Sequence, residues 1–180
     1  MGEEPGALTD HEGTLLGLIV RAGPLTAYQV GKIYDRSPVS NFNTSKGKLY
    51  PLIRRLRQRG LLAAIPVEDD ARGTEKLAAT EAGKAAVRRW CMEIKPAHLL
   101  LDDPLRTKVQ SFELFSREER VEWCVTARAL LSRKLKELEA YKDEVEVPFH
   151  DYVHSNAAGA IRQRIEWLDT LLHGLTRPSS

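Results

Sequence analysis

The feature that most constrains the fold is one short amphipathic run, residues 45–59, which reads SKGKLYPLIRRLRQR. Its apolar side chains follow the i, i+3, i+4, i+7 spacing that places them on one face of a helix. They are Leu49, Leu52, Ile53 and Leu56. At about 100° per residue, Tyr50, Pro51 and Arg54 point the opposite way. The chain must therefore bury one side of this helix and leave the other side exposed.

Positive charge is concentrated in the N-terminal half of the chain. Residues 16–67 hold nine cations and one anion, whereas residues 102–151 hold twelve acids and nine bases. Six of the nine cations lie in the amphipathic run, which has no carboxylate: Lys46, Lys48, Arg54, Arg55, Arg57 and Arg59. Because a solvated helix face usually interleaves acids with bases, this pattern favours an N-terminal half that meets a polyanion.

Pro51 admits two positions in this helix. Proline lacks an N–H, and its ring presses on the carbonyl four residues earlier. Either the helix begins near Lys48, with Pro51 in its first turn, or it begins near Ser45 and is kinked, with Gly47 at the crowded position. In both cases residues 45–50 form a helix N-terminus whose free amides favour anions.

Capping boxes mark two helices before this run. Thr9 and Glu12 have the spacing at which each side chain satisfies the other residue's backbone amide. Thr26 and Gln29 repeat that spacing, and the second helix is expected to end near Ser37. The expected buried positions are Leu15, Leu18 and Ile19 in the first helix and Val30, Ile33 and Tyr34 in the second.

Residues 61–80 change from helical to alternating periodicity. Ile65 and Val67 alternate as in a strand, and Pro66 marks that strand as an edge. A charged turn follows, and the chain returns as a second strand that ends before Thr80. Thr80 caps a further helix. The residues expected on its buried face are Val87, Trp90, Cys91 and Ile94.

The C-terminal part of the chain is helical. Ser116 and Glu119 form a third capping box, and apolar residues recur until a break at Pro148. The last helix, expected from about Ser155, carries a narrow apolar stripe. The stripe consists of Ile161, Ile165, Leu168, Leu172 and Leu175. Two helices alone cannot cover both of their stripes, so these residues are candidates for dimerisation. Packing back on the N-terminal domain is the alternative.

These elements predict a mainly α protein. Residues 1–95 form a winged helix-turn-helix domain with a two-stranded wing, and residues 96–180 form a long-helix dimerisation domain. The sequence resembles the PadR-like transcriptional regulators. The resemblance rests on LLGLIVRAGPL (15–25), Tyr28, SKGKLYPLIRRLRQRGLL (45–62) and LAATEAGKAAV (77–87). Family members carry aromatic residues in the returning wing strand, where this chain has KLAA (76–79).

The resemblance implies a homodimeric bacterial repressor, located in the cytoplasm, whose third helix enters the major groove of double-stranded DNA. A homodimer predicts a pseudo-palindromic operator. The candidate DNA-binding residues are Tyr28, Lys32, Thr44, Ser45, Lys46, Gly47, Lys48, Tyr50, Arg54 and, on the wing tip, Arg72. Some family members bind flat aromatic compounds, so Trp90 and Trp123 are candidate residues of a pocket for a small aromatic effector. Ordinary core packing of both tryptophans is the alternative.

A second function stays open from the sequence alone, namely a winged-helix module that docks an acidic protein partner on the same basic face. His150 and His154 stand at i, i+4 with an acid between them, close to a zinc-protease motif, but no third ligand is evident. We therefore expect no enzyme activity, metal or cofactor. No apolar run reaches the roughly 18–20 residues that span a bilayer. Cys91 and Cys124 have no CxxC spacing, which predicts reduced, buried thiols.

Overall fold

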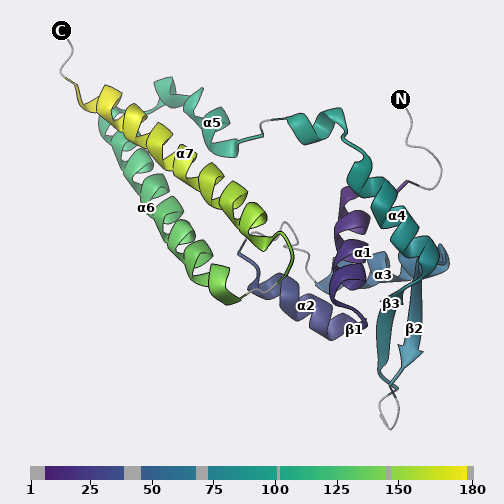
Figure 1. The fold of residues 1–180 in the computed structure, drawn as a ribbon. Helices are drawn as coiled ribbons and strands as arrows, with labels where there is room; N and C mark the ends of the chain where they lie inside the picture. The colour runs from purple at the N-terminus through teal and green to yellow at the C-terminus, as the bar shows by residue number, and fades with distance from the viewer. Residues whose placement is uncertain (1–6, 39–45, 68–72, 101, 145–146, 178–180) are drawn as a thin grey trace. The chain divides into compact units, whose positions relative to one another are not determined.

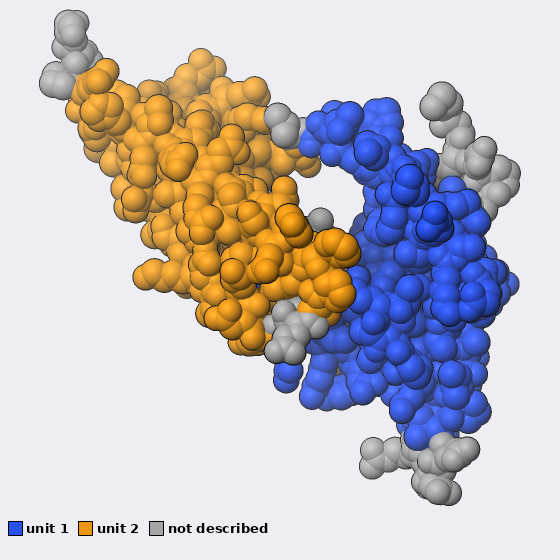
Figure 2. All heavy atoms as spheres, viewed as in Figure 1, with its two compact units in different colours: residues 1–100 blue, residues 101–180 orange. Residues whose placement is uncertain are grey.

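A computed structural model describes residues 7–38, 46–67, 73–100, 102–144 and 147–177. It divides into two compact units, here called unit 1 (residues 1–100) and unit 2 (residues 101–180), which Figure 2 colours separately. The units divide after residue 100, and the domain boundary expected after residue 95 stays a prediction. Within the described ranges, no helix is both long and apolar enough to cross a membrane.

The elements of each unit follow the predicted order (Figure 1). Unit 1 contains α1 (Asp10–Ala22), β1 (Leu25–Thr26), α2 (Ala27–Arg36), α3 (Lys46–Gln58), β2 (Leu62–Pro66), β3 (Glu75–Ala79), α4 (Glu81–Met92) and the 3-10 turn η1 (Pro96–Leu99). Unit 2 contains α5 (Pro104–Val109), η2 (Phe112–Leu114), α6 (Arg117–Tyr141), η3 (Lys142–Glu144) and α7 (His150–Thr176). The predicted mainly α fold with a winged helix-turn-helix is confirmed.

All three predicted capping boxes are present. The Thr9 amide donates to Glu12 Oε2 at 3.0 Å, and the Thr26 amide donates to Gln29 Oε1 at 2.8 Å. The third box, at Ser116, opens α6. Each box satisfies amides that the first turn of a helix leaves without partners, which is why these helix starts could be read from sequence.

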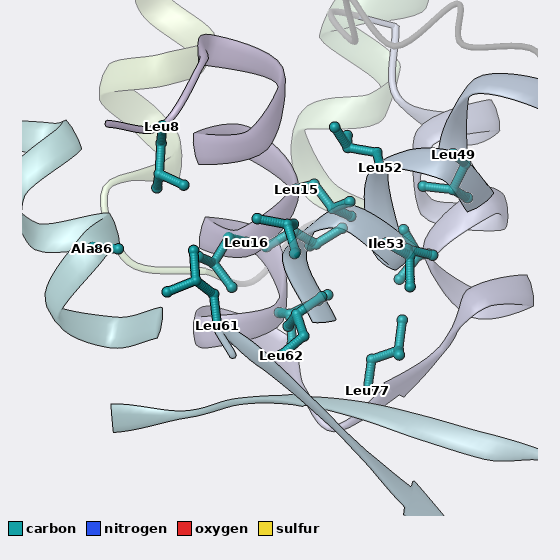
Figure 3. Close-up of a cluster of buried hydrophobic side chains, with 14 residues drawn as sticks. Leu8, Leu15, Leu16, Leu49, Leu52, Ile53, Leu61, Leu62, Leu77 and Ala86 are labelled. Carbon is teal, nitrogen blue, oxygen red and sulfur yellow. The ribbon is translucent and has the colours of Figure 1, made fainter. Parts of the chain in front are cut away.

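Unit 1 has a continuous hydrophobic core (Figure 3). α1 contributes Leu15 and Leu16, and α4 contributes Ala86. All four apolar residues of the amphipathic run are buried, and Leu56 is fully inaccessible. Burying a leucine side chain stabilises a fold by about 1.5–3 kcal/mol. This face therefore holds α3 in the unit and determines which of its side chains face solvent.

The wing is part of a small antiparallel sheet with the order β1-β3-β2. β2 is an edge strand, as Pro66 predicted. The two-residue strand β1 was not predicted, because it is too short to show a period; it pairs Leu25 with Leu77 of β3. Leu77 of the returning strand is buried in the core. The packing contact that aromatic residues were expected to make in this strand is therefore made by a leucine.

The expected buried face of α4 was partly wrong. Cys91 is exposed, and Ile94 lies beyond the helix with 76% of its surface accessible. Val87 and Trp90 pack against the core as expected, and Ala86, which was not expected there, is buried with them. Cys124 is buried as predicted, and its burial raises the pKa of its thiol.

Unit 2 is built on α6 and α7, which run antiparallel. Polar bridges join the two helices at their open end, middle and turn. Arg117 Nε donates to the carbonyl oxygen of Leu175 at 2.7 Å, and Arg128 pairs with Asp169. Near the turn, His154 Nε2 lies 3.2 Å from Glu139 Oε2.

The start of α7 and the cover of its apolar stripe differ from expectation. α7 begins at His150, earlier than the expected Ser155, because the turn through Phe149 (φ 64°) redirects the chain directly after Pro148. Leu168 is fully buried, and the other four stripe residues are partly buried within this one chain. α6 therefore covers part of a stripe that the sequence suggested was unpartnered.

Candidate nucleic-acid interface

α3 contains a proline in its second turn and ends before a glycine. The helix begins at Lys46, so Pro51 lies inside it, which agrees with the earlier of the two predicted starts. At the other end, Gly60 adopts φ 69°. The Gly60 amide donates to the Arg57 carbonyl at 2.9 Å, and the Leu61 amide donates to the Leu56 carbonyl at 3.0 Å. This Schellman pattern turns the chain directly into the wing.

The outward face of α3 is hollowed. Tyr50 and Arg54 are exposed, and they border a surface hollow of about 510 Å³. Its lining residues are Tyr50, Pro51, Ile53, Arg54, Arg57 and Gln58. The hollow therefore combines one aromatic ring, two guanidinium groups and one amide, which are groups that contact phosphates and base edges.

Glu12 of α1 forms ion pairs with two cations of the run. It is only 2% exposed, and its carboxylate lies 3.2 Å from Arg55 Nε and 3.1 Å from Arg59 Nη1. Arg59 also donates to the carbonyl oxygen of Ala7 at 3.3 Å. Because the same carboxylate caps α1 through Thr9, it ties the start of α1 to the end of α3.

A third cation of the run is paired by the wing. Arg57 Nη1 lies 2.9 Å from Glu75 Oε2 of β3, and both side chains are nearly half exposed. The run has no carboxylate of its own, which suggested that its six cations are unpaired. That interpretation was wrong, because carboxylates distant in sequence pair with three of them. Among the residues that the structure describes, Lys48 and Arg54 have no carboxylate partner.

Other predicted contacts lie on α2 or outside the described residues. Tyr28 is 61% exposed, and Lys32 Nζ lies 4.9 Å from the centre of its ring, within cation–π distance. The predicted residues Thr44, Ser45 and Arg72 lie outside the described residues. Lys46 and Gly47 belong to α3 by their backbone, but the Lys46 side chain is not among those described.

The two tryptophans of the expected effector pocket each have contacts inside their own unit. In unit 1, Trp90 Nε1 donates to Asp10 Oδ1 at 3.1 Å, and its ring lies against the backbone of Gly13. In unit 2, Trp123 packs edge-to-face on Phe112 at 5.1 Å between ring centres. An effector pocket at these residues stays a prediction.

The histidine pair of α7 makes contacts that bridge to α6 and η3. His150 Nε2 lies 3.1 Å from the carbonyl oxygen of Lys142, and His154 lies against Glu139. The two rings are 6.2 Å apart between centres. In the described part of the chain, no three histidine, cysteine or acidic side chains gather as a metal site would require.

Solved structures share this fold. *Bacillus subtilis* PadR in complex with operator DNA matches at a TM-score of 0.78 and 19% identity, over 93% of this chain and 99% of that one. PadR in complex with p-coumaric acid matches at 0.75 and 18%, over 93% and 96%. The PadR-like regulator BC1756 from *Bacillus cereus* matches at 0.72 and 14%, over 97% and 99%. The chain has the PadR fold. No family model and no curated protein matches the sequence.

Three residues of the candidate interface were not predicted in these roles from the sequence. Glu12 was recognised only as a capping residue, and Arg57 only as one of six cations. Glu75 was not singled out. A capping glutamate is ordinarily exposed, so a buried one needed the distant Arg55 and Arg59 to be known. No local signal indicated that Glu75 would face α3.

Proposed function

We propose that this chain is a DNA-binding transcriptional regulator that contacts duplex DNA through the outward face of α3. The observation that carries the proposal is the separation of charges on that helix. Arg54 borders the hollow beside Tyr50 with no carboxylate partner among the described residues, while Arg55 is held by Glu12. PadR from *B. subtilis*, which has this fold, was solved in complex with operator DNA.

The neighbouring arginines supply a matched test of this proposal. A duplex selected from a random pool is bound by the parent, by Arg54→Gln and by Arg55→Gln, each over a range of salt concentrations. Loss of a base contact at Arg54 should weaken binding by about tenfold or more, and loss of a phosphate contact should reduce the salt slope by about one unit. Arg55→Gln removes the same charge and should change affinity by less than about twofold, because Glu12 already neutralises Arg55.

Equal losses from the two variants would contradict the assignment of α3's outward face. Failure of the parent to bind any duplex at low salt would contradict DNA binding itself. That result would favour the other function open from sequence, a module that docks an acidic protein. Measuring duplex binding over a range of salt concentrations distinguishes the two functions, because binding that neutralises several phosphates depends steeply on salt.

The regulator is further proposed to act as a homodimer through unit 2. Large hydrophobic residues of unit 2 are exposed in the single chain, among them Leu114, Tyr152 and Val153 at 80, 77 and 57%. Exposed apolar surface of this kind marks association sites. Sedimentation of the full chain should show a dimer at micromolar concentration, and a pseudo-palindromic operator should follow. A monomer under those conditions would contradict this part of the proposal.

The last part of the proposal is that the chain acts as a repressor and that a small aromatic effector releases it from DNA. The support is the fold shared with PadR in complex with p-coumaric acid and the tryptophans Trp90 and Trp123. Titration of planar aromatic acids should quench tryptophan fluorescence and release the selected duplex at the same concentrations. If no such compound changes either signal, control by aromatic acids is excluded for this chain.

A further inference from the structure

The carboxylates that neutralise α3 differ in how readily they can be displaced. Glu12 is 2% exposed and holds two arginines together with the Thr9 amide, so its pairs are part of the packed fold. Among the described residues, Glu75 is paired with Arg57 alone, and the two side chains are 46% and 43% exposed. Water and ions reach the second pair freely, and exposed pairs of this kind are weak.

Arg57 is also the paired cation that borders the hollow. It lines that surface together with Tyr50 and Arg54. Its partner Glu75 lies at the start of β3, where it is paired in register with Pro66 at the end of β2. Glu75 lies two residues before the buried Leu77 in β3, and side chains two residues apart leave a strand on the same face. The Glu75 side chain therefore leaves the sheet on the face that covers the core. The wing thus delivers a carboxylate to the rim of the proposed DNA-binding surface.

We propose that the ion pair with Glu75 makes Arg57 less available to DNA phosphates and thereby lowers the affinity of the protein for DNA. The inference rests on the proposed DNA-binding function and deepens it. In the free protein, the carboxylate neutralises Arg57. A phosphate that enters the hollow competes with Glu75 for the same guanidinium. Because this competition concerns the backbone of the nucleic acid, Glu75 weakens binding to all duplex sequences alike.

Removing the competing charge tests this directly. Glu75→Gln preserves the size of the side chain, and both members of the pair are exposed enough for the variant to fold. Its affinity for the selected duplex and for an unrelated duplex should rise by the same factor, about two- to tenfold at low salt. The slope of log affinity against log salt should steepen by about 0.9, the value for one added phosphate contact.

Two further variants show whether the gain passes through Arg57. In Arg57→Gln with Glu75→Gln, the gain over Arg57→Gln alone should disappear, since the released guanidinium is absent. Glu81→Gln makes the same change in net charge on α4, where Glu81 is 88% exposed and pairs with Lys84 at 2.7 Å. It should raise affinity by less than about twofold, because the effect of an exposed charge is screened over a Debye length of about 10 Å.

The outcomes separate this inference from the function beneath it. If the parent binds duplex DNA and Glu75→Gln binds no more tightly, Glu75 does not restrain Arg57 and the inference is overturned alone. A gain that survives the loss of Arg57, or that Glu81→Gln reproduces, overturns it equally. If the parent binds no duplex at low salt, the proposed function and this inference are overturned together.

Discussion

The two units of the chain differ in how completely each buries its own apolar surface. Among the described residues of unit 1, fourteen buried hydrophobic residues form one cluster, drawn from four helices, the wing strands and the segments just before α1 and β2. In unit 2, the described residues that are buried and hydrophobic are Cys124, Leu138, Ala158 and Leu168. A pair of helices has only one shared seam, whereas a helix-and-sheet unit can surround its core on several sides. Unit 1 therefore surrounds one large core, whereas the described residues of unit 2 bury few apolar side chains.

Exposed large hydrophobic residues occur in both units but are distributed differently along the chain. In unit 1 the most exposed of them gather after the end of the core, from Met92 at 79% to Leu100 at 73%. In unit 2 they are spread over η2, α6 and the start of α7, as at Leu114, Leu130 and Phe149. The spread of exposed apolar residues along unit 2 agrees with the homodimer proposed above.

The largest expected effect on stability, and the strongest test of this comparison, comes from replacing one buried leucine in each unit. Leu15 and Leu168 are both fully inaccessible. Leu15→Ala should lower the free energy of unfolding by about 3–5 kcal/mol, through lost burial and the cavity left behind. Leu168→Ala should remove about 2–4 kcal/mol, and its effect on the melting temperature should grow as the protein is diluted, because weaker association exposes unit 2.

Thermal unfolding at two protein concentrations, followed by circular dichroism and tryptophan fluorescence, measures both variants. Leu15→Ala is the control for Leu168→Ala, because it lies in unit 1 and its effect on the melting temperature should not depend on protein concentration. If the loss from Leu168→Ala is independent of concentration, the hairpin is stable without a partner. The contrast between the units would then be one of size alone.

The sequence predicted unit 1 better than unit 2, for a physical reason. Capping boxes and the apolar face of α3 are local patterns, so Thr9, Thr26 and Leu56 could be placed without knowledge of the fold. The ion pairs of Glu12 and Glu75 join residues far apart in the chain, and no local pattern specifies them. The same limit applies to the stripe of α7, whose cover by α6 depends on tertiary packing.

A smaller effect sharpens the picture of unit 1 as closely packed. Gly13 and Gly17 both lie in α1, where replacing glycine by alanine ordinarily stabilises a helix by about 1 kcal/mol. A Cβ at Gly13 would overlap the ring of Trp90, whereas one at Gly17 would lie 3.9 Å from Val87 Cγ1, an ordinary contact. Gly13→Ala should therefore destabilise by about 1–3 kcal/mol, and Gly17→Ala should stabilise by about 0.5–1 kcal/mol. Equal stabilisation of both variants in urea denaturation would show that α1 and α4 are not in close contact.

The smallest effect concerns the polar contact that closes the same seam. Trp90 donates to Asp10, and this hydrogen bond lowers the pKa of the Asp10 carboxyl below its ordinary 3.8, against the opposing effect of burial. A carboxyl whose pKa is lower in the folded state stabilises the fold above its unfolded value and loses that contribution as pH falls through the folded value. The Asp10 side chain is more than half exposed, so the contribution is at most about 0.5 kcal/mol.

Trp90→Phe should therefore be less stable than the parent at neutral pH, and part of that difference should disappear between about pH 4 and pH 2. The packing loss from the smaller ring remains at every pH, so only the pH-dependent part reports the hydrogen bond. Trp167→Phe in α7 makes the same chemical change at a residue with no hydrogen bond to a carboxylate among those described, and its difference from the parent should be constant with pH. Urea denaturation of the three proteins across this range measures both quantities. A constant difference for Trp90→Phe as well would mean that the indole does not hold the carboxylate, and that unit 1 is closed along α1 and α4 by apolar packing alone.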